Sequence, residues 1–238
     1  MSKVRALFIQ SINDILISET VEWNEKATQN SLQKYVVKNG VYHLLSSSKI
    51  AEAIQRMSDI HFMAAFIESW ETMTEPMTAI RYVGVETMCE GFKTNIESIE
   101  QNRESAKAAQ RLSRFLDTAG RYDTGLTIAL WAQNIFQEQC GELHKDTLSA
   151  MNSVGLLYIG KAMYDEALSL YTKALEVNKT IFGAEHKETL MSRNNLGTVY
   201  AEQGEYDKAE SLHATNLEIR ERVLGEDDEE TLISLGNL

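Results

Sequence analysis

Proline and cysteine are scarce in this chain, and each shortage narrows the choice of fold. Pro76 is the single proline among 238 residues, so long stretches can continue as helix without a breaker. The two cysteines, Cys89 and Cys140, lie far apart, and only His144 is near either of them at a ligand spacing. The sequence therefore favours an all-α protein and predicts neither a disulfide framework nor a zinc site.

Positive charge and long apolar runs are also in short supply. Lysine and arginine total 23 against 35 for aspartate and glutamate, which gives a formal net charge of -12. This charge offers no attraction to nucleic acid or to an anionic membrane, so neither is expected as a partner. Gln10, Asn13 and Asp14 interrupt the apolar N-terminal stretch, and no run approaches the roughly 18 apolar residues that span a bilayer. We expect a soluble, cytoplasmic protein.

A spacing of 42 residues organises the second half of the chain. Shifting the sequence by that amount lays HKDTLSAMNSVGLLY, from His144, over HKETLMSRNNLGTVY, from His186. The register continues upstream into a more divergent copy around Tyr122 and downstream to Thr231. Such periods indicate stacked helical hairpins, because two short amphipathic helices cannot bury their apolar faces alone. We predict repeats at about 105–146, 147–188 and 189–230, and a partial repeat at 231–238.

Small residues recur at fixed places in each repeat. Gly155 and Gly197 are expected to mark close helix crossings, where the missing side chain lets Tyr158 and Tyr200 wedge between the helices. Threonine or acidic residues in the loops should cap the first helix of each repeat. The glycines that follow the second apolar run should end the second helix in a left-handed conformation. These glycines are Gly183 and Gly225.

The same residues carry a resemblance to a known family. The L-G-x-x-Y motif at Leu196, Gly197 and Tyr200, with the alanine at Ala209, resembles the tetratricopeptide repeat. The longer 42-residue pattern resembles the kinesin light chain and nephrocystin type, most completely over residues 187–225. The chain departs from that type because lysine or glutamate, not proline, follows the loop histidine or its equivalent. The resemblance implies an α-solenoid of helical hairpins that binds other proteins and is not an enzyme.

Residues 1–104 show helical spacing without the 42-residue period. We interpret them as a helical connector domain that precedes the repeat array at 105–238. The segment Tyr35–Ser69 resembles the connector that often follows the nucleotide-binding domain in signalling ATPases with C-terminal repeats. This resemblance implies an alternative function, as the regulatory or sensor part of a larger signalling NTPase whose catalytic core is absent from this chain.

The apparent chemical motifs do not predict catalysis. Gly120–Thr127 imitates a phosphate-binding loop, but Leu126 stands where that loop needs lysine, and the segment aligns with the turn inside later repeats. His144 and His186 occur once per repeat, which spreads them along the array instead of converging them on one metal. We therefore predict no catalytic residue, no cofactor, no cofactor-binding residue and no metal ligand.

Function is then sought on a surface, and the first helices of stacked repeats offer a concave one. The basic side chains of the first repeat suit an acidic or mixed-charge peptide, and asparagine can pair with a peptide backbone because it both donates and accepts. An alternative stays open, in which the asparagines join helix to helix. The predicted groove residues are Lys107, Gln110, Arg111, Arg114, Asn152, Ser153, Leu156, Asn194, Asn195 and Thr198.

Two expectations about partners follow. The main one is a protein interaction scaffold that binds a peptide or helical segment of another protein in the groove of the repeats. The second is self-association through the C-terminal repeat, because a partial repeat leaves an apolar face uncovered.

Overall fold

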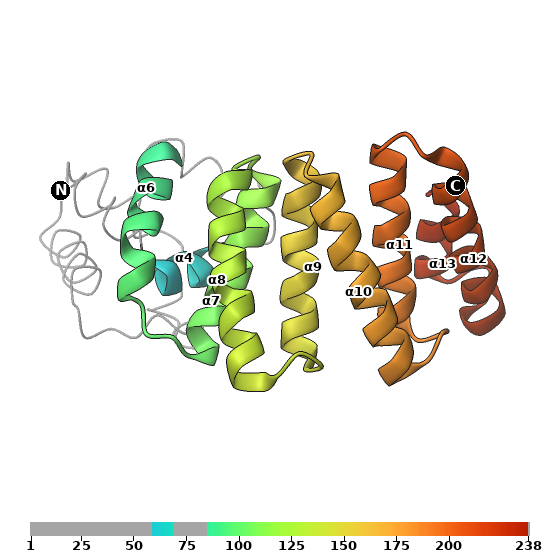
Figure 1. The fold of residues 1–238 in the computed structure, drawn as a ribbon, viewed down its shortest axis with the longest axis horizontal. Helices are drawn as coiled ribbons and strands as arrows, with labels where there is room; N and C mark the ends of the chain where they lie inside the picture. The colour runs from blue at the N-terminus through green and yellow to red at the C-terminus, as the bar shows by residue number, and fades with distance from the viewer. Residues whose placement is uncertain (1–58, 69–84, 238) are drawn as a thin grey trace, which may run out of the picture. The chain divides into compact units, whose positions relative to one another are not determined.

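The computed structural model describes residues 59–68 and 85–237, and every regular element in these two ranges is a helix. Figure 1 shows their succession along the chain. The elements are α4 (Ile60–Glu68), α6 (Val85–Asn95), the 3-10 helix η2 (Ile96–Ser98), α7 (Arg103–Thr118), α8 (Tyr122–Cys140), α9 (Lys145–Gly160), α10 (Tyr164–Phe182), α11 (Lys187–Glu202), α12 (Tyr206–Leu224) and α13 (Glu229–Leu235). The predicted all-α fold with a repeated helical arrangement is confirmed.

The chain divides into two compact units, Met1–Ile135 and Phe136–Leu238, which we call the N-terminal and C-terminal units. In the N-terminal unit, α4 packs against α7. The Asp59 carboxylate caps α4 because its Oδ1 accepts the backbone N–H groups of His61 at 2.9 Å and Phe62 at 3.0 Å. The cap fixes the start of a short helix in which Ile60, Phe62, Met63 and Ala64 are buried.

The predicted connector lies largely outside the described residues. Of the segment Tyr35–Ser69, the structure describes only residues 59–68, which form α4 and its cap. The contact of α4 with α7 includes a polar pair, His61 Nε2 and Ser105 Oγ, 3.2 Å apart. The boundary at residue 104 and the resemblance to an ATPase connector stay predictions.

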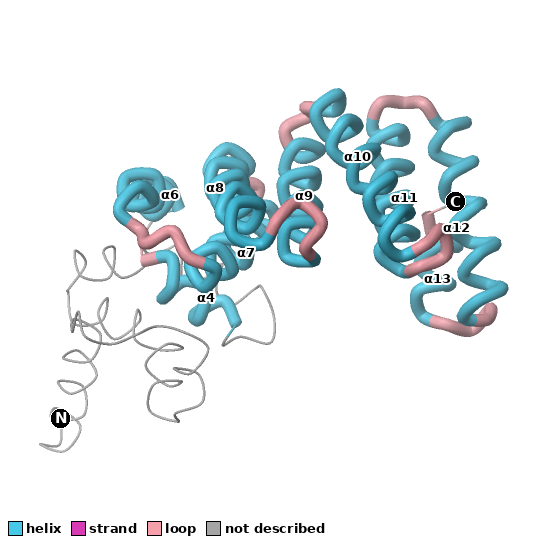
Figure 2. Tube along the Cα trace, turned by 60° about the horizontal axis from the view of Figure 1, so that its bottom comes forward, coloured by secondary structure: helices cyan, strands magenta, loops and turns pink. Residues whose placement is uncertain are grey.

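In the C-terminal unit, helices α9 to α13 pack in chain order, each against the next, as both views show (Figures 1 and 2). We call α7, α9, α11 and α13 first helices, and α8, α10 and α12 second helices. A buried cluster of Ala167, Tyr171, Leu196 and Val199 joins α10 to α11. The cluster lies at a repeat boundary, so each hairpin completes its core on its neighbour. Ala209 is buried at the position equivalent to Ala167, as the repeat pattern predicts.

One residue caps each first helix at the 42-residue spacing. His144 Nδ1 accepts the Asp146 N–H at 3.1 Å before α9, and His186 Nδ1 accepts the Glu188 N–H at 3.3 Å before α11. Each cap satisfies a backbone donor that the helix itself leaves without a partner. The prediction that loop threonines or acidic residues cap the first helices is confirmed before α13, where Asp228 is the cap, and is wrong before α9 and α11, where histidines are. The four capping residues are Asn102, His144, His186 and Asp228.

The loop threonines close the loops between repeats. Thr147 and Thr189 donate their hydroxyls to the carbonyls of Gly141 and Gly183, each at 2.7 Å. Gly183 and Gly225 end α10 and α12 with φ of 93° and 97°, as the predicted left-handed φ requires. Their ψ values of 167° and 163° are extended instead of helical, in a region that is essentially restricted to glycine. The backbone therefore changes from helical to extended at this glycine, where the loop begins.

The close crossings at Gly155 and Gly197 are present, but their partners differ from the expected tyrosines. A Cβ atom at position 155 would lie 2.6 Å from Tyr171 Oη, and one at position 197 would lie 2.8 Å from His213 Cε1. Tyr171 and His213 are equivalent residues of the second helices, and both are buried. The ring of the second helix, rather than the tyrosine three residues after the glycine, fills the space.

The contact between Gly197 and His213 predicts that substitutions at these two positions affect stability non-additively. Gly197→Ser should lower the free energy of unfolding by about 1–3 kcal/mol, because the added side chain overpacks the contact with His213. His213→Ala should offset part of this loss in the double variant, since the first repeat has Ser113 and Ala129 buried at the equivalent positions. Urea denaturation of the two single variants and the double variant should give a coupling energy of about 0.5–3 kcal/mol. If the double variant loses the sum of the stability losses of the two single variants, the contact is contradicted.

Because it is buried at this contact, His213 makes the free energy of unfolding depend on pH. Its side chain is 5% exposed, and within the described ranges its Nδ1 has no hydrogen-bond partner. Burial lowers the pKa of the His213 imidazole from its usual value, because the charged form loses solvation. The unfolded chain therefore binds a proton at a higher pH than the folded chain does. Stability from the neutral ring is complete above the unfolded pKa of about 6.5 and is lost as the pH falls through the lower folded pKa.

His213→Tyr should remove this part of the pH dependence. Tyr171 occupies the equivalent position against Gly155 and donates its hydroxyl to the Asn152 carbonyl at 3.2 Å, so the second repeat shows that a tyrosine fits. We expect the wild type to lose about 1.4 kcal/mol on acidification for each unit by which burial lowers the pKa. Urea titrations at pH 7.5 and below the folded pKa measure the loss. An equal loss in His213→Tyr would show that other groups cause it.

Candidate protein-binding surface

The basic residues predicted for the groove lie on α7 in the N-terminal unit. Lys107 is half-buried, and its Nζ pairs with Glu104 Oε1 at 2.9 Å. Gln110 and Arg111 are half-buried as well, whereas Arg114 is exposed. Because the Lys107 pair is accessible to solvent, it neutralises part of the local positive charge without adding much stability. Among the predicted basic residues of α7, Arg114 carries the most exposed positive charge.

The predicted residues of α9 differ in how much they offer to a partner. Ser153 is buried, and its hydroxyl donates to the Ser149 carbonyl of the same helix at 3.3 Å. Leu156 is exposed and presents an apolar side chain. Asn152 is half-buried, so part of its amide reaches the surface. The α9 surface thus consists of an amide and an apolar group, and Ser153 contributes no free hydroxyl.

The asparagines form amide pairs that link successive first helices. Asn195 on α11 donates its Nδ2 to Asn152 Oδ1 on α9. Asn237, which follows α13, donates its Nδ2 to Asn194 Oδ1 on α11 at 2.8 Å. Both pairs join positions that differ by 43 in the sequence, so the second pair repeats the first one repeat later. We call these two pairs the amide rungs.

The amide rungs change how the predicted asparagines are interpreted. The structure contains the helix-to-helix contact that the sequence left open as an alternative. Each asparagine has both a donor and an acceptor, however, and a rung uses only one of them from each partner. Among the described residues, Asn152 Nδ2 and Asn195 Oδ1 have no other partner, and the same holds for Asn194 Nδ2 and Asn237 Oδ1. Each rung therefore leaves one donor and one acceptor side by side.

Thr198 completes the predicted set on α11. Its hydroxyl donates to the Asn194 carbonyl at 3.1 Å, so its hydrogen-bonding capacity is directed along its own helix. Among the predicted residues of α11, Asn194 and Asn195 are therefore the ones whose side chains are not bound within their own helix. Thr198 adds its methyl group beside them, four residues further along the same face.

One set of polar contacts, in which second helices bind the next first helix, was not predicted from the sequence. Asn178 on α10 donates its Nδ2 to the Glu188 carbonyl at 3.3 Å and to Ser192 Oγ at 2.8 Å. One repeat later, Arg220 on α12 donates its Nη1 to the Glu230 carbonyl and to a serine hydroxyl, Ser234 Oγ, both at 2.8 Å. We call Asn178 and Arg220 the junction donors.

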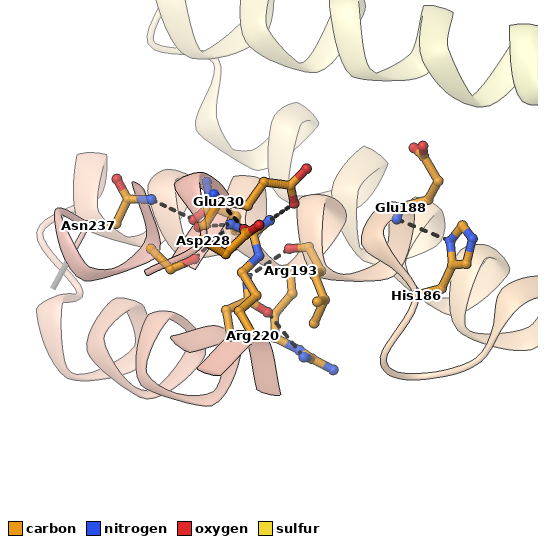
Figure 3. A network of polar contacts seen from close by, with 11 residues as sticks. His186, Glu188, Arg193, Arg220, Asp228, Glu230 and Asn237 are labelled. Atoms are coloured by element: carbon orange, nitrogen blue, oxygen red, sulfur yellow. Dashed lines mark hydrogen bonds and ion pairs between the residues drawn. The ribbon is translucent and has the colours of Figure 1, made fainter. Parts of the chain in front are cut away.

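The junction donors are buried, so their hydrogen bonds count for more than surface contacts would. Asn178 is 3% exposed and Arg220 is 7% exposed. Figure 3 shows Arg220 directed at Glu230 beside α13, and its Nη2 also lies 3.5 Å from Glu230 Oε2. An unpaired charge at such a site would be strongly destabilising. The signal in the sequence was the repeated spacing of a polar residue on the second helix and Ser192 or Ser234 on the next first helix.

A further buried amide ties α12 to α11. Asn216 is fully buried, and its Nδ2 donates to the Leu190 carbonyl at 2.8 Å. Its Oδ1 accepts from Arg193 Nη1 at 3.1 Å. Burial lowers the pKa of the Arg193 guanidinium from its usual range, because the charged form loses solvation. These residues stabilise the helix contact and are not part of the exposed amide surface.

Other predicted features can be placed from the described residues. Gly120–Thr127 forms the turn between α7 and α8 and the start of α8, which is the position that the repeat pattern predicts. No helix in the described ranges is long and apolar enough to cross a membrane. On α13, Leu232, Ile233 and Leu235 are more than half exposed. The expected self-association stays a prediction.

The repeats match a known protein family. The family model for the tetratricopeptide repeat matches residues 104–180, 160–214 and 188–238, and these matches together cover more than half of the chain. The array of helical hairpins thus defines the class, and the chain belongs to the tetratricopeptide repeat family. No curated protein matches the sequence.

Solved structures specify the type of repeat. A variant of a kinesin light chain-like protein from Podosopora anserina, with nearly identical TPR-like repeats, is similar with a TM-score of 0.57 and 14% identity. The similarity covers 94% of this chain and 99% of that one. The apo form of RapI gives a TM-score of 0.56 and 17% identity, covering 99% of this chain and 64% of that chain. The repeats are of the kinesin light chain type in fold, as the sequence resemblance implied.

Proposed function

We propose that this protein is an interaction scaffold that binds an extended segment of a partner protein along the first helices of its repeats. Tetratricopeptide repeat proteins generally mediate protein–protein interactions, and no enzymatic family is indicated for this chain. The observation that carries the proposal is the pair of amide rungs, which join α9 to α11 and α11 to Asn237 after α13.

A rung has the hydrogen-bonding groups that an extended peptide needs. A peptide unit presents one N–H donor and one C=O acceptor. Asn195 Oδ1 can accept the N–H while Asn152 Nδ2 donates to the C=O, so one rung can hold one residue without reading its side chain. Packed helices lie about 8–10 Å apart and an extended chain rises about 3.3 Å per residue. Successive rungs would therefore engage the backbone about once every three residues.

The partner's side chains are the source of selectivity in this proposal. Leu156 is exposed on α9 and provides apolar contact. Arg111 and Arg114 lie on α7 of the N-terminal unit, and we expect their positive charge to speed the encounter with an acidic partner. The ligand class is therefore an acidic or mixed-charge peptide that contains apolar residues.

Kinetics can separate the contributions of the amides and the charges. The chain is immobilised, a partner is captured and identified by mass spectrometry, and its binding segment is synthesised as a peptide. Asn194→Ala with Asn195→Ala should speed dissociation of this peptide about tenfold to a hundredfold, since each lost hydrogen bond costs about 1 kcal/mol. Arg111→Glu with Arg114→Glu should instead slow association and reduce its dependence on salt.

A control variant tests whether substitutions away from the first helices affect binding. Thr172 and Ser211 are exposed on the second helices α10 and α12, so Thr172→Ala with Ser211→Ala should leave both rate constants unchanged. Circular dichroism establishes that each variant is folded before binding is measured. Wild-type rate constants in both the asparagine and the arginine variants would place the binding site elsewhere on the protein.

A further inference from the structure

Three metal-ligating side chains of different types meet where α8 is followed by α9 in the C-terminal unit. Cys140 is the last residue of α8, His144 caps α9, and Asp146 lies in the first turn of α9. The Cys140 Sγ, one imidazole nitrogen of His144 and one carboxylate oxygen of Asp146 all lie within 4.8 Å of one another. All three residues are half-buried, so the cluster is accessible from solvent but partly shielded by protein.

The repeat geometry explains why the thiol lies beside the imidazole. The equivalent residues one repeat later are Phe182 and His186, whose rings stack with their centroids 4.7 Å apart. In both of these loops the last residue of the second helix lies beside the capping histidine. At the first such loop the aromatic ring is replaced by Cys140, and a packing contact becomes a pair of ligands.

We propose that Cys140, His144 and Asp146 bind a zinc-class transition metal ion, with Zn²⁺ as the natural candidate. Thiolate, imidazole and carboxylate are the three ligand types found in zinc sites, and the combination of sulfur and nitrogen disfavours Mg²⁺ and Ca²⁺. Three protein ligands leave the fourth tetrahedral position for water or for a ligand from a partner. The three side chains must converge from their present separation, because zinc–ligand bonds are about 2.0–2.3 Å long.

Metal binding at this site competes with the cap of α9 and with the proton of the Cys140 thiol. A neutral imidazole has one lone pair in the ring plane for hydrogen bonding, and His144 Nδ1 uses it to accept the Asp146 N–H at 3.1 Å. Coordination through either ring nitrogen therefore ends the cap of α9. The Cys140 thiol must also release its proton to solvent as the sulfur–metal bond forms, so affinity falls as the pH is lowered.

Sister repeats supply variants that remove single ligands and keep the local fold. Cys140→Phe introduces the residue found at the equivalent position 182, and His144→Asn introduces the residue that caps α7 at position 102. Asn102 Oδ1 accepts the Ser105 N–H at 2.9 Å, so an asparagine can provide the cap. Cys89 lies in α6 of the N-terminal unit, and Cys89→Ala serves as the control for the second thiol.

The test uses the reduced, chelator-treated full chain without an affinity tag, and Co²⁺ as a spectroscopic probe. We expect one equivalent of Co²⁺ to give a thiolate-to-cobalt charge-transfer absorption, and Zn²⁺ to displace it. Cys140→Phe should abolish the absorption, His144→Asn should weaken binding at least about tenfold, as the loss of one metal ligand implies, and Cys89→Ala should behave as wild type. Circular dichroism of each variant checks the fold. No charge-transfer absorption in the wild type, or an unchanged one in Cys140→Phe, would overturn the proposal.

Discussion

The fold depends on the fact that a two-helix hairpin of this length cannot cover both of its apolar faces. Each second helix must therefore dock on the first helix of the next repeat, as α10 does on α11 through Tyr171 and Val199. The docking is also polar at its centre, because the junction donors Asn178 and Arg220 bind a carbonyl and a serine hydroxyl of the next first helix. Apolar burial supplies the attraction, and the directed hydrogen bonds favour one register.

A fixed register between repeats is what creates the candidate binding surface. Asn152 and Asn195 meet only because α9 and α11 are held so that positions 43 residues apart face each other, and the second rung repeats the arrangement. The side chains that set the register are buried, whereas the amides that result from it are partly exposed. Packing and the proposed recognition thus use different faces of the same first helices, so the surface can vary without loss of the core.

Sequence periodicity predicted the helices, the repeat length and the close approach at Gly155 and Gly197, because all three depend on spacing along the chain. Contacts between helices were harder to predict, since they depend on how the helices rotate against each other. The rings of Tyr171 and His213, not Tyr158 and Tyr200, fill the crossings, and Asn178 and Arg220 were not singled out. The spacing of Cys140 and His144 was noticed, but Asp146 was not counted as a third group beside them.

The junction donors should couple successive repeats into one cooperative structure. Native-state hydrogen exchange of Asn178→Ala tests this coupling, because exchange reports the free energy of opening for each helix separately. Thr180→Ala is the control, since Thr180 is exposed on the same helix. We predict that Asn178→Ala lowers the opening free energies of α11, α12 and α13 more than those of α9 and α10. Thr180→Ala should leave the opening free energies of all five helices at their wild-type values. An equal loss of opening free energy in all five helices of Asn178→Ala would contradict the coupling.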